Sequence, residues 1–166
     1  MPTPAPTPER VRYLVLTLGR SDRGPFAAAI ERYRARLDAA SGGVELRALK
    51  ASRFASAAER RAADADTLLA AARAVGGRTV LLDERGTSFD TSSLAAHVAE
   101  LELRGESRLT LLVGAADGVD EGVRTQVDAV WSLSPLTLPH ELALVVLLEQ
   151  LYRVASLAAG HPYHRP

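Results

Sequence analysis

Apolar positions along the chain follow two spacings that alternate from one segment to the next. From Phe26 to Leu37, apolar side chains recur every three or four residues, the spacing of a helix with one buried face. Short apolar runs rich in β-branched residues lie between such segments and predict buried strands. We therefore predict an α/β fold with a five-stranded, mainly parallel sheet flanked by helices. The predicted strands are Val11–Leu18, Val44–Leu49, Arg78–Asp83, Arg108–Val113 and Ala129–Leu133.

Residues that start and stop helices define the helical segments. Pro25 suits the first turn of the first helix, because the N–H that proline lacks would be unpaired there, and Gly42 ends this helix. Gly76 closes an Ala-rich second helix, and either Asp90 or Thr91 is expected to cap the third. The later helical segments are Ser56–Val75, Thr91–Leu103, a short one in Glu121–Asp128, and about Glu141–Ala159.

The last of these helices is apolar on almost every side. A helix on the surface of a monomer would show a polar face. The helix is therefore either sandwiched within the fold or buries a second face against another copy of the chain. We favour the homodimer, because small α/β domains rarely enclose a helix completely. The apolar positions are Leu142, Leu144, Val145, Val146, Leu147, Leu148, Leu151, Val154 and Leu157.

Length and composition limit the class of protein. The chain has 166 residues, 47% of them hydrophobic, which predicts one domain over residues 11–166 after a flexible Pro-rich arm at residues 1–10. The absence of cysteine excludes disulfides, thiolate zinc sites and a cysteine nucleophile. The longest apolar stretch, in Leu142–Leu148, falls far short of the about 20 residues of a membrane span. No signal peptide is visible, so we expect a cytoplasmic protein without membrane contact.

Charge is distributed unevenly although its net value is zero. Residues 1–80 hold 14 basic and 8 acidic side chains, whereas residues 81–166 hold 6 and 12. A basic half is compatible with nucleic-acid binding. Arg32, Arg34 and Arg36, which lie mostly off the apolar face of the first helix, equally suit a solvated helix surface. Charge alone leaves both interpretations open.

Three loops follow strands at the edge of the sheet where α/β proteins bind ligands. They are Leu82–Gly86, Gly114–Gly118 and Leu133–His140. Glycines in the second loop would let the backbone approach a ligand closely, although the loop matches neither phosphate-binding glycine motif and could be a simple turn. The third loop is unusually apolar. We expect it either to be buried or to enclose an apolar group such as an adenine ring.

The C-terminal segment His161–Arg165 combines two histidines, a tyrosine and an arginine. A chain end with no further contacts would fray. Alternatively, these side chains could form a lid that stacks on a nucleobase and contacts its phosphates. No metal site is expected, because His161 and His164 have no further ligands nearby in the sequence.

Specific strings of residues resemble a known family. Trp131–His140 reads WSLSPLTLPH, Leu151–Arg153 reads LYR, and His161–Arg165 reads HPYHR. These strings closely resemble the ribosomal RNA large subunit methyltransferase H family, of the SPOUT class of knotted methyltransferases. The resemblance extends over residues 11–166. It implies a homodimeric SPOUT fold with a C-terminal trefoil knot.

The resemblance also implies an activity and its site. The expected reaction is S-adenosylmethionine-dependent methylation of N3 of a pseudouridine in 23S rRNA, on the assembled ribosome. By matching position, the expected cofactor contacts are Leu82, Gly114, Leu133, Ser134, Pro135, Leu136, Thr137 and Leu138. The expected catalytic set is Arg153, His161, Tyr163, His164 and Arg165. A histidine of this set would take the N3 proton, an arginine would stabilise the imide anion, and Tyr163 would stack on the base.

One loop departs from the family pattern. The family commonly has adjacent glycines and a glutamate where this chain has Ala115 and Asp117. The methyl group of Ala115 could narrow the pocket, and alanine does not tolerate a positive φ as glycine does. A non-catalytic ribosome-binding or assembly factor that retains the fold is therefore the alternative.

Overall fold

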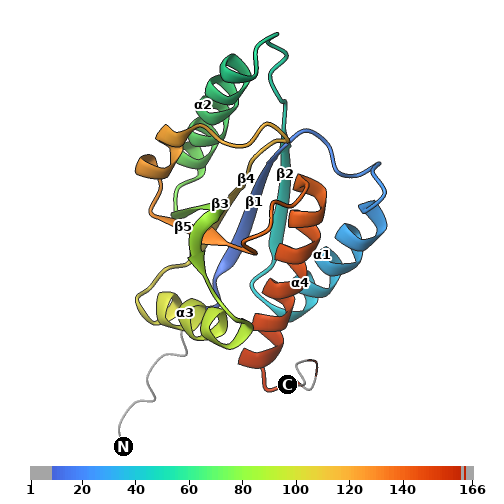
Figure 1. Ribbon diagram of the computed structural model, residues 1–166. Helices are drawn as coiled ribbons and strands as arrows, with labels where there is room; N and C mark the ends of the chain where they lie inside the picture. The colour runs from blue at the N-terminus through green and yellow to red at the C-terminus, as the bar shows by residue number, and fades with distance from the viewer. Residues whose placement is uncertain (1–8, 162, 164–166) are drawn as a thin grey trace, which may run out of the picture.

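The computed structural model describes residues 9–161 and Tyr163. Its centre is a five-stranded sheet in the order β2-β1-β4-β3-β5 (Figure 1). Every neighbouring pair in this sheet is parallel, so the predicted fold class is confirmed and the sheet is entirely rather than mainly parallel. Residues 1–8 of the predicted arm lie outside the described residues. The strands are β1 (Arg12–Leu18), β2 (Val44–Leu49), β3 (Arg78–Ser88), β4 (Arg108–Val113) and β5 (Ala129–Ser132).

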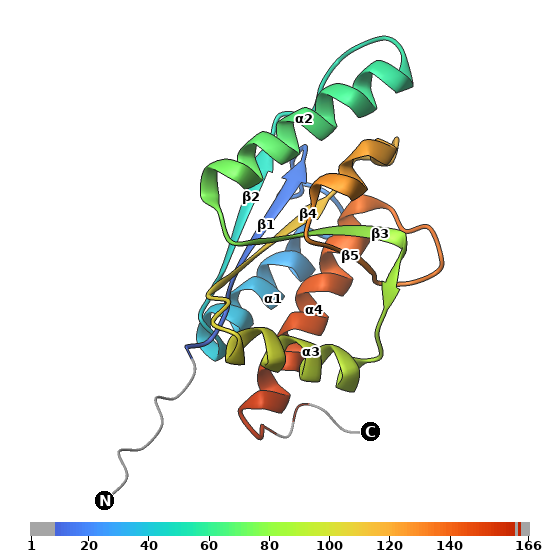
Figure 2. The ribbon, with the colours of Figure 1, turned by 90° about the vertical axis from the view of Figure 1, so that its left-hand side faces the viewer.

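Helices cover both faces of the sheet. Figure 2 shows α1, α3 and α4 on one face, and α2 with the short 3-10 helix η1 on the other. Side chains alternate along β1 accordingly: Tyr13 and Val15 join the core under α1, α3 and α4, whereas Leu14 and Leu16 join the core under α2. The helices are α1 (Ala27–Ala40), α2 (Ala57–Val75), α3 (Thr91–Leu103), η1 (Glu121–Gln126) and α4 (His140–Ala158).

Side-chain caps fix the starts of two helices. The Ser56 hydroxyl accepts a hydrogen bond from the Glu59 N–H at 3.1 Å and starts α2. The Asp90 carboxylate accepts one from the Ser93 N–H at 2.7 Å, so Asp90 rather than Thr91 caps α3. Gly76, with φ +75°, ends α2 as predicted.

The predicted end of the third strand was wrong. β3 does not stop at Asp83 but continues to Ser88, with a shift in its register against β5 between Leu82 and Thr87. Gly86 permits this path, because a Cβ there would lie 2.7 Å from the backbone of Val130. Leu82–Gly86 is therefore an irregular part of a strand rather than a loop after it. Its polar and glycine residues mark a bulge that keeps β3 paired with β5.

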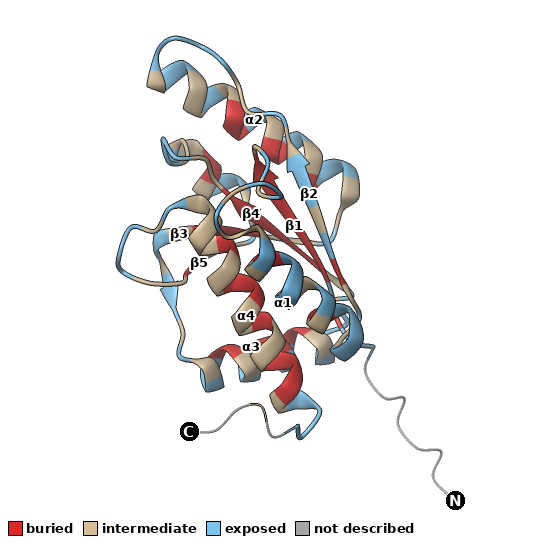
Figure 3. Cartoon of the chain, turned by 90° about the vertical axis from the view of Figure 1, so that its right-hand side faces the viewer, coloured by how far each residue is buried: buried red, intermediate tan, exposed pale blue. Residues whose placement is uncertain are grey.

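Helix α4 packs between α1 and α3 of the same chain (Figure 3). One stripe of the helix, including Leu144, Leu148 and Leu151, is fully buried there. Leu142, Val145, Val146 and Leu157, which lie off this stripe, are only half-buried. Enclosure within the fold thus explains part of the apolar pattern of α4. No helix in residues 9–161 is both long and apolar enough to cross a membrane.

Candidate functional site

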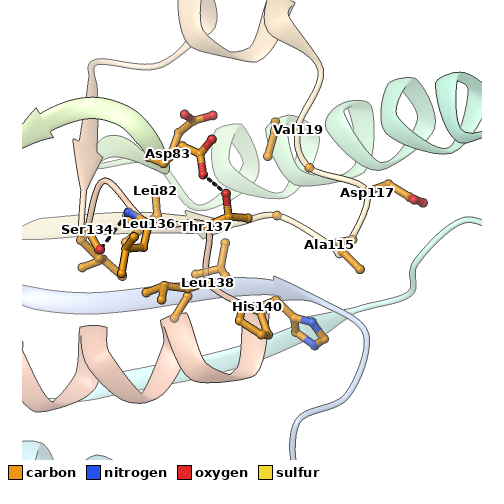
Figure 4. Close-up of a pocket in the computed structure, with 18 of the residues that line it drawn as sticks. Leu82, Asp83, Ala115, Asp117, Val119, Ser134, Leu136, Thr137, Leu138 and His140 are labelled. Atoms are coloured by element: carbon orange, nitrogen blue, oxygen red, sulfur yellow. Dashed lines mark hydrogen bonds between the residues drawn. The ribbon is translucent and has the colours of Figure 1, made fainter.

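A pocket of about 650 Å³ opens where the carboxyl ends of the central strands meet the start of α4 (Figure 4). Its volume is within the range of pockets that hold cofactors, about 300–1,000 Å³. One wall comes from β3, a second from the turn after β4, and a third from the segment between β5 and α4. The lining residues are Leu82–Arg85, Val113–Val119, Leu133, Ser134, Leu136–His140 and Ala143.

The pocket brings together most of the residues expected to contact the cofactor. Seven of the eight line it: Leu82, Gly114, Leu133, Ser134, Leu136, Thr137 and Leu138. Pro135 is exposed and is not part of the lining. The general rule for parallel sheets and the family resemblance therefore select the same cavity.

Hydrogen bonds within the wall and across to β3 shape the segment between β5 and α4. The Ser132 hydroxyl donates to the Ser134 carbonyl at 2.9 Å, and the Ser134 hydroxyl accepts from the Leu136 N–H at 3.0 Å. The Thr137 hydroxyl donates to the Glu84 carboxylate at 2.5 Å (Figure 4). Burial of this segment, one of two predicted options, is not observed, because Leu136 is 70% exposed. Its apolar side chains instead line an open cavity.

The turn after β4 is compact and unstrained. The Gly118 N–H donates to the Ala115 carbonyl at 3.0 Å, and Gly118 takes φ +80°. A Cβ on Gly114 would overlap Cγ2 of Val119. No described residue other than glycine has a positive φ, so Ala115 occupies its position without backbone strain.

Ion pairs surround the cavity. The Asp83 carboxylate lies 2.6 Å from the Arg124 guanidinium. Burial disfavours ionisation of Asp83, but the hydrogen bond from the Arg85 N–H and the positive charge of Arg124 outweigh it and hold the pKa of Asp83 below the usual range. Arg85 lies 2.6 Å from Glu121 on η1. The sequence placed Asp83 and Arg85 in one of the three expected loops, but it did not point to their partners Arg124 and Glu121.

Comparison with known proteins identifies the family. The profile described as "Predicted SPOUT methyltransferase" matches residues 11–164. A Ribosomal RNA large subunit methyltransferase H from Methylobacterium sp. (strain 4-46) is 38% identical over 159 residues, covering 93% of this chain and 98% of the relative. The chain belongs to this family of SPOUT methyltransferases. A relative of the same name from Thermus thermophilus is 56% identical over 94 residues, covering 57% of this chain and 66% of that protein.

Solved structures agree with the fold. A probable methyltransferase from Bordetella pertussis Tohama I superposes with a TM-score of 0.54 at 18% identity, covering 89% of this chain and 96% of that one. A probable methylase family protein from Haemophilus influenzae Rd KW20 gives a TM-score of 0.52 at 13% identity, covering 96% and 72%. At these identities the likeness concerns the fold alone.

The C-terminal residues of this SPOUT methyltransferase gather away from the pocket. The Arg153 Nε donates to the carboxylate of Glu149, one turn earlier on α4, at 3.0 Å. Arg153 Cζ also lies 4.8 Å from the centre of the Tyr163 ring, and the Tyr163 hydroxyl donates to Glu149 at 3.4 Å. The His161 side chain is exposed. His164 and Arg165 lie outside the described residues.

Helix α4 separates the two predicted sets of residues. His140 lines the pocket at the start of α4, and Arg153 is thirteen residues further along. At 1.5 Å per residue this places them about 20 Å apart. One protomer therefore does not bring its described C-terminal residues to its own pocket. Among the described residues, no group of three His, Asp or Glu side chains is placed to hold a metal ion.

Proposed function

We propose that this chain transfers a methyl group from S-adenosylmethionine to N3 of a pseudouridine in 23S rRNA, on the assembled ribosome. The observation that carries the proposal is the pocket in which β3, the turn after β4 and the segment before α4 meet. The printed name of the relatives, Ribosomal RNA large subunit methyltransferase H, supports an rRNA substrate. A ribosomal substrate would place this activity in the cytoplasm.

The lining fits S-adenosylmethionine in its chemistry. Three leucines, Leu82, Leu133 and Leu138, offer apolar surface for an adenine ring. Gly114 and Gly118 have no side chains, so the backbone of the turn after β4 can approach a ligand closely. Asp83 and Glu84 supply negative charge near a cofactor that carries a sulfonium. Bound there, the cofactor would supply an electrophilic methyl group.

The chain's own residues would position the target base and manage its proton. The N3–H of the base must lose its proton before N3 attacks well, and His161 or His164 is suited to accept it near neutral pH. Arg153 or Arg165 would stabilise the resulting imide anion. Tyr163 would stack on the base. Positioning of this kind can contribute several kcal/mol to catalysis.

We propose that the functional unit is a homodimer in which the tail of the partner subunit completes each pocket. The length of α4 between His140 and Arg153 and the half-buried apolar residues on α4 support this arrangement. We also propose that the segment from β5 into α4 forms the trefoil knot of the SPOUT class, supported by the meeting of three chain segments at one pocket. A crystal structure in which α4 does not pass through a loop formed by the preceding segments would contradict the knot.

The non-catalytic alternative gains no support from the described residues. It depended on Ala115 and Asp117 in the turn after β4. Neither residue has a positive φ, and both lie in a turn that lines the pocket.

Calorimetric titration with S-adenosylmethionine, followed by methyl transfer to ribosomes that lack this methyl group, tests the proposal. We expect saturable binding by a dimer and transfer that weakens as salt rises, because arginine–phosphate contacts release counterions. Tyr163→Ala, His164→Ala and deletion of residues 163–166 should keep cofactor binding and lose turnover. Unchanged turnover in all three variants would remove the tail from the mechanism. A folded dimer that binds no cofactor, even with ribosomes present, would contradict the proposed activity.

A further inference from the structure

Three tyrosine rings converge on one guanidinium at the surface formed by α1, α4 and the C-terminal segment. Arg36 Cζ lies 5.6 Å from the centre of the Tyr33 ring, 5.7 Å from Tyr152 and 5.9 Å from Tyr163. We call these four residues the Arg36 cage. They come from α1, α4 and the chain beyond α4, so the cage connects three parts of the molecule that are distant in sequence.

The charge of Arg36 is directed at these rings rather than at a carboxylate. Arg34, two residues earlier on α1, pairs with Glu31 at 2.6 Å and with Asp38 at 2.7 Å. No ion pair to Arg36 is present among the residues that the structure describes. A guanidinium near aromatic faces is attracted by the negative potential of the rings and can stack on them. Arg36 is therefore not one of the solvated arginines of α1, although the sequence pattern allowed that interpretation.

Tyr163 is held from several directions. Its ring lies between Arg36 and Arg153, at 5.9 Å and 4.8 Å from the two guanidinium carbons. It meets Tyr152 edge-on, with ring centres 4.6 Å apart, and its hydroxyl donates to Glu149. Burial among these groups raises the pKa of the Tyr163 phenol. Arg153, Tyr152 and Glu149 all belong to α4, so Arg36 ties Tyr163 to a second helix.

This second attachment is needed because the chain turns sharply after α4. Gly160 has φ +66°, and the His161 N–H donates to the Ser156 carbonyl at 2.8 Å. Beyond this point a short polar chain end would fray without further contacts. Contact with Arg36 restricts where Tyr163 lies relative to α4.

We propose that Arg36 is a positioning residue: it holds the Tyr163 ring in the place from which this side chain would act in the pocket of the partner subunit. This inference rests on the proposed function, in which the tail acts on the target base. Arg36 would touch neither the cofactor nor the base. Its effect would appear in the rate of transfer from the bound complex, since small displacements of groups that hold the reacting atoms slow a reaction strongly.

Arg36→Ala, compared with Arg34→Ala as a matched loss of charge on the same helix, tests the proposal by kinetics on ribosomes. We expect Arg36→Ala to lower kcat by about tenfold or more, with the KM for ribosomes and the affinity for S-adenosylmethionine unchanged. Arg34→Ala should behave as the wild type. A raised KM with unchanged kcat would make Arg36 a phosphate contact and overturn the proposal. Unchanged kinetics, or a monomeric Arg36→Ala protein, would also overturn it.

A second measurement does not depend on activity. The chain has four tyrosines, and Tyr13, which is buried in the core, is not among the three rings near Arg36. In a protein with isotopically labelled tyrosines, Arg36→Ala should shift the NMR signals of Tyr33, Tyr152 and Tyr163 and leave that of Tyr13 in place. A shift of Tyr13 would indicate general unfolding, and unchanged signals for the other three would show that the cage does not form; either result overturns the proposal. If the wild type transfers no methyl group, the proposed function fails, while these signals still decide whether Arg36 anchors Tyr163.

Discussion

Arg60 on α2 and Asp117 in the turn after β4 form an ion pair, with Nε 2.7 Å from Oδ2. The same guanidinium donates to the carbonyls of Phe54 and Ala55, so it joins the turn to the segment before α2. The hydrogen bond from Arg60 lowers the pKa of Asp117. Asp117 thus has a partner on α2 that fixes one wall of the pocket.

Arg60→Ala should weaken binding of S-adenosylmethionine by less than about tenfold, because the pair is accessible to solvent and such pairs contribute little each. The loss should shrink as salt rises, since salt already screens the pair in the wild type. Calorimetric titration at two salt concentrations measures both effects. Arg104→Ala, which removes an exposed pair with Glu100 on α3, is the control and should bind as the wild type. Equal affinities of Arg60→Ala and Arg104→Ala for S-adenosylmethionine would show that the ion pair between α2 and the turn after β4 does not affect the pocket.

Gly114→Ala should reduce cofactor affinity and destabilise the fold, because its Cβ would overlap Cγ2 of Val119. Crowding of this kind costs about 1–3 kcal/mol. Since the obstacle is the end of a side chain, adding Val119→Ala should restore most of the stability. Urea unfolding and cofactor titration of the single and double variants give the answer. A double variant less stable than Gly114→Ala would show that the side chain of Val119 is not the obstacle.

Gly86→Ala should cost more than Gly114→Ala, about 3 kcal/mol or more, because no side chain can move aside. Its Cβ would meet the backbone of Val130 and Trp131 at 2.7 Å, where β3 bends past β5. We expect loss of the β3–β5 pairing and therefore of the pocket. Gly105→Ala, at a glycine with open space around its Cβ and φ +87°, is a control for backbone strain alone. If Gly86→Ala and Gly105→Ala lower the free energy of unfolding equally, the close approach of the Val130 backbone does not explain the loss of stability in Gly86→Ala.

The sequence predicted the order of strands and helices, because apolar spacing and capping residues act locally. Asp90, one of the two expected caps, starts α3, and Val44–Leu49 forms a strand with the predicted bounds. The end of β3 was not predicted, because its continuation past Asp83 depends on pairing with β5, 44 residues further along the chain (Thr87 with Trp131, Ser88 with Ser132). A local pattern cannot show that Gly86 sits against the backbone of another strand.

The same distinction applies to the candidate site. The three pocket segments could be predicted because the carboxyl ends of parallel strands share one edge of the sheet. The partners that other elements supply could not be predicted. Nothing in the sequence near Asp83 points to Arg124, and nothing near Tyr163 points to Arg36. Only the three-dimensional arrangement shows that an arginine from an apparently solvated helix face meets three aromatic rings.

Stability should depend on pH through Asp83. Its folded pKa lies below that of the unfolded chain, about 3.9, so its contribution is complete above that pH and is lost as pH falls through the folded value. Asp83→Asn should therefore cost about 1–3 kcal/mol at pH 7, because it removes the carboxylate 2.6 Å from Arg124 and leaves that guanidinium only the more distant Glu121, at 3.8 Å. The difference from the wild type should persist down to pH 5 and narrow below about pH 4. Urea unfolding at pH 7, 5 and 3 measures it, and a difference that stays constant to pH 3 would exclude Asp83 as the titrating group.

Complementation between two inactive variants should show whether each site draws on two subunits. Leu136→Arg adds a positive charge at an exposed position of the pocket and should repel the sulfonium, while Tyr163→Ala disables the tail. In a mixed dimer one site combines both defects and the other has neither, so co-expression should restore about a quarter of wild-type activity if subunits pair at random. If pocket and tail act within one protomer, every site in the mixture keeps a defect and no activity returns. The measurement is methyl transfer by the co-expressed pair, with each variant alone as the baseline and each checked for dimer mass.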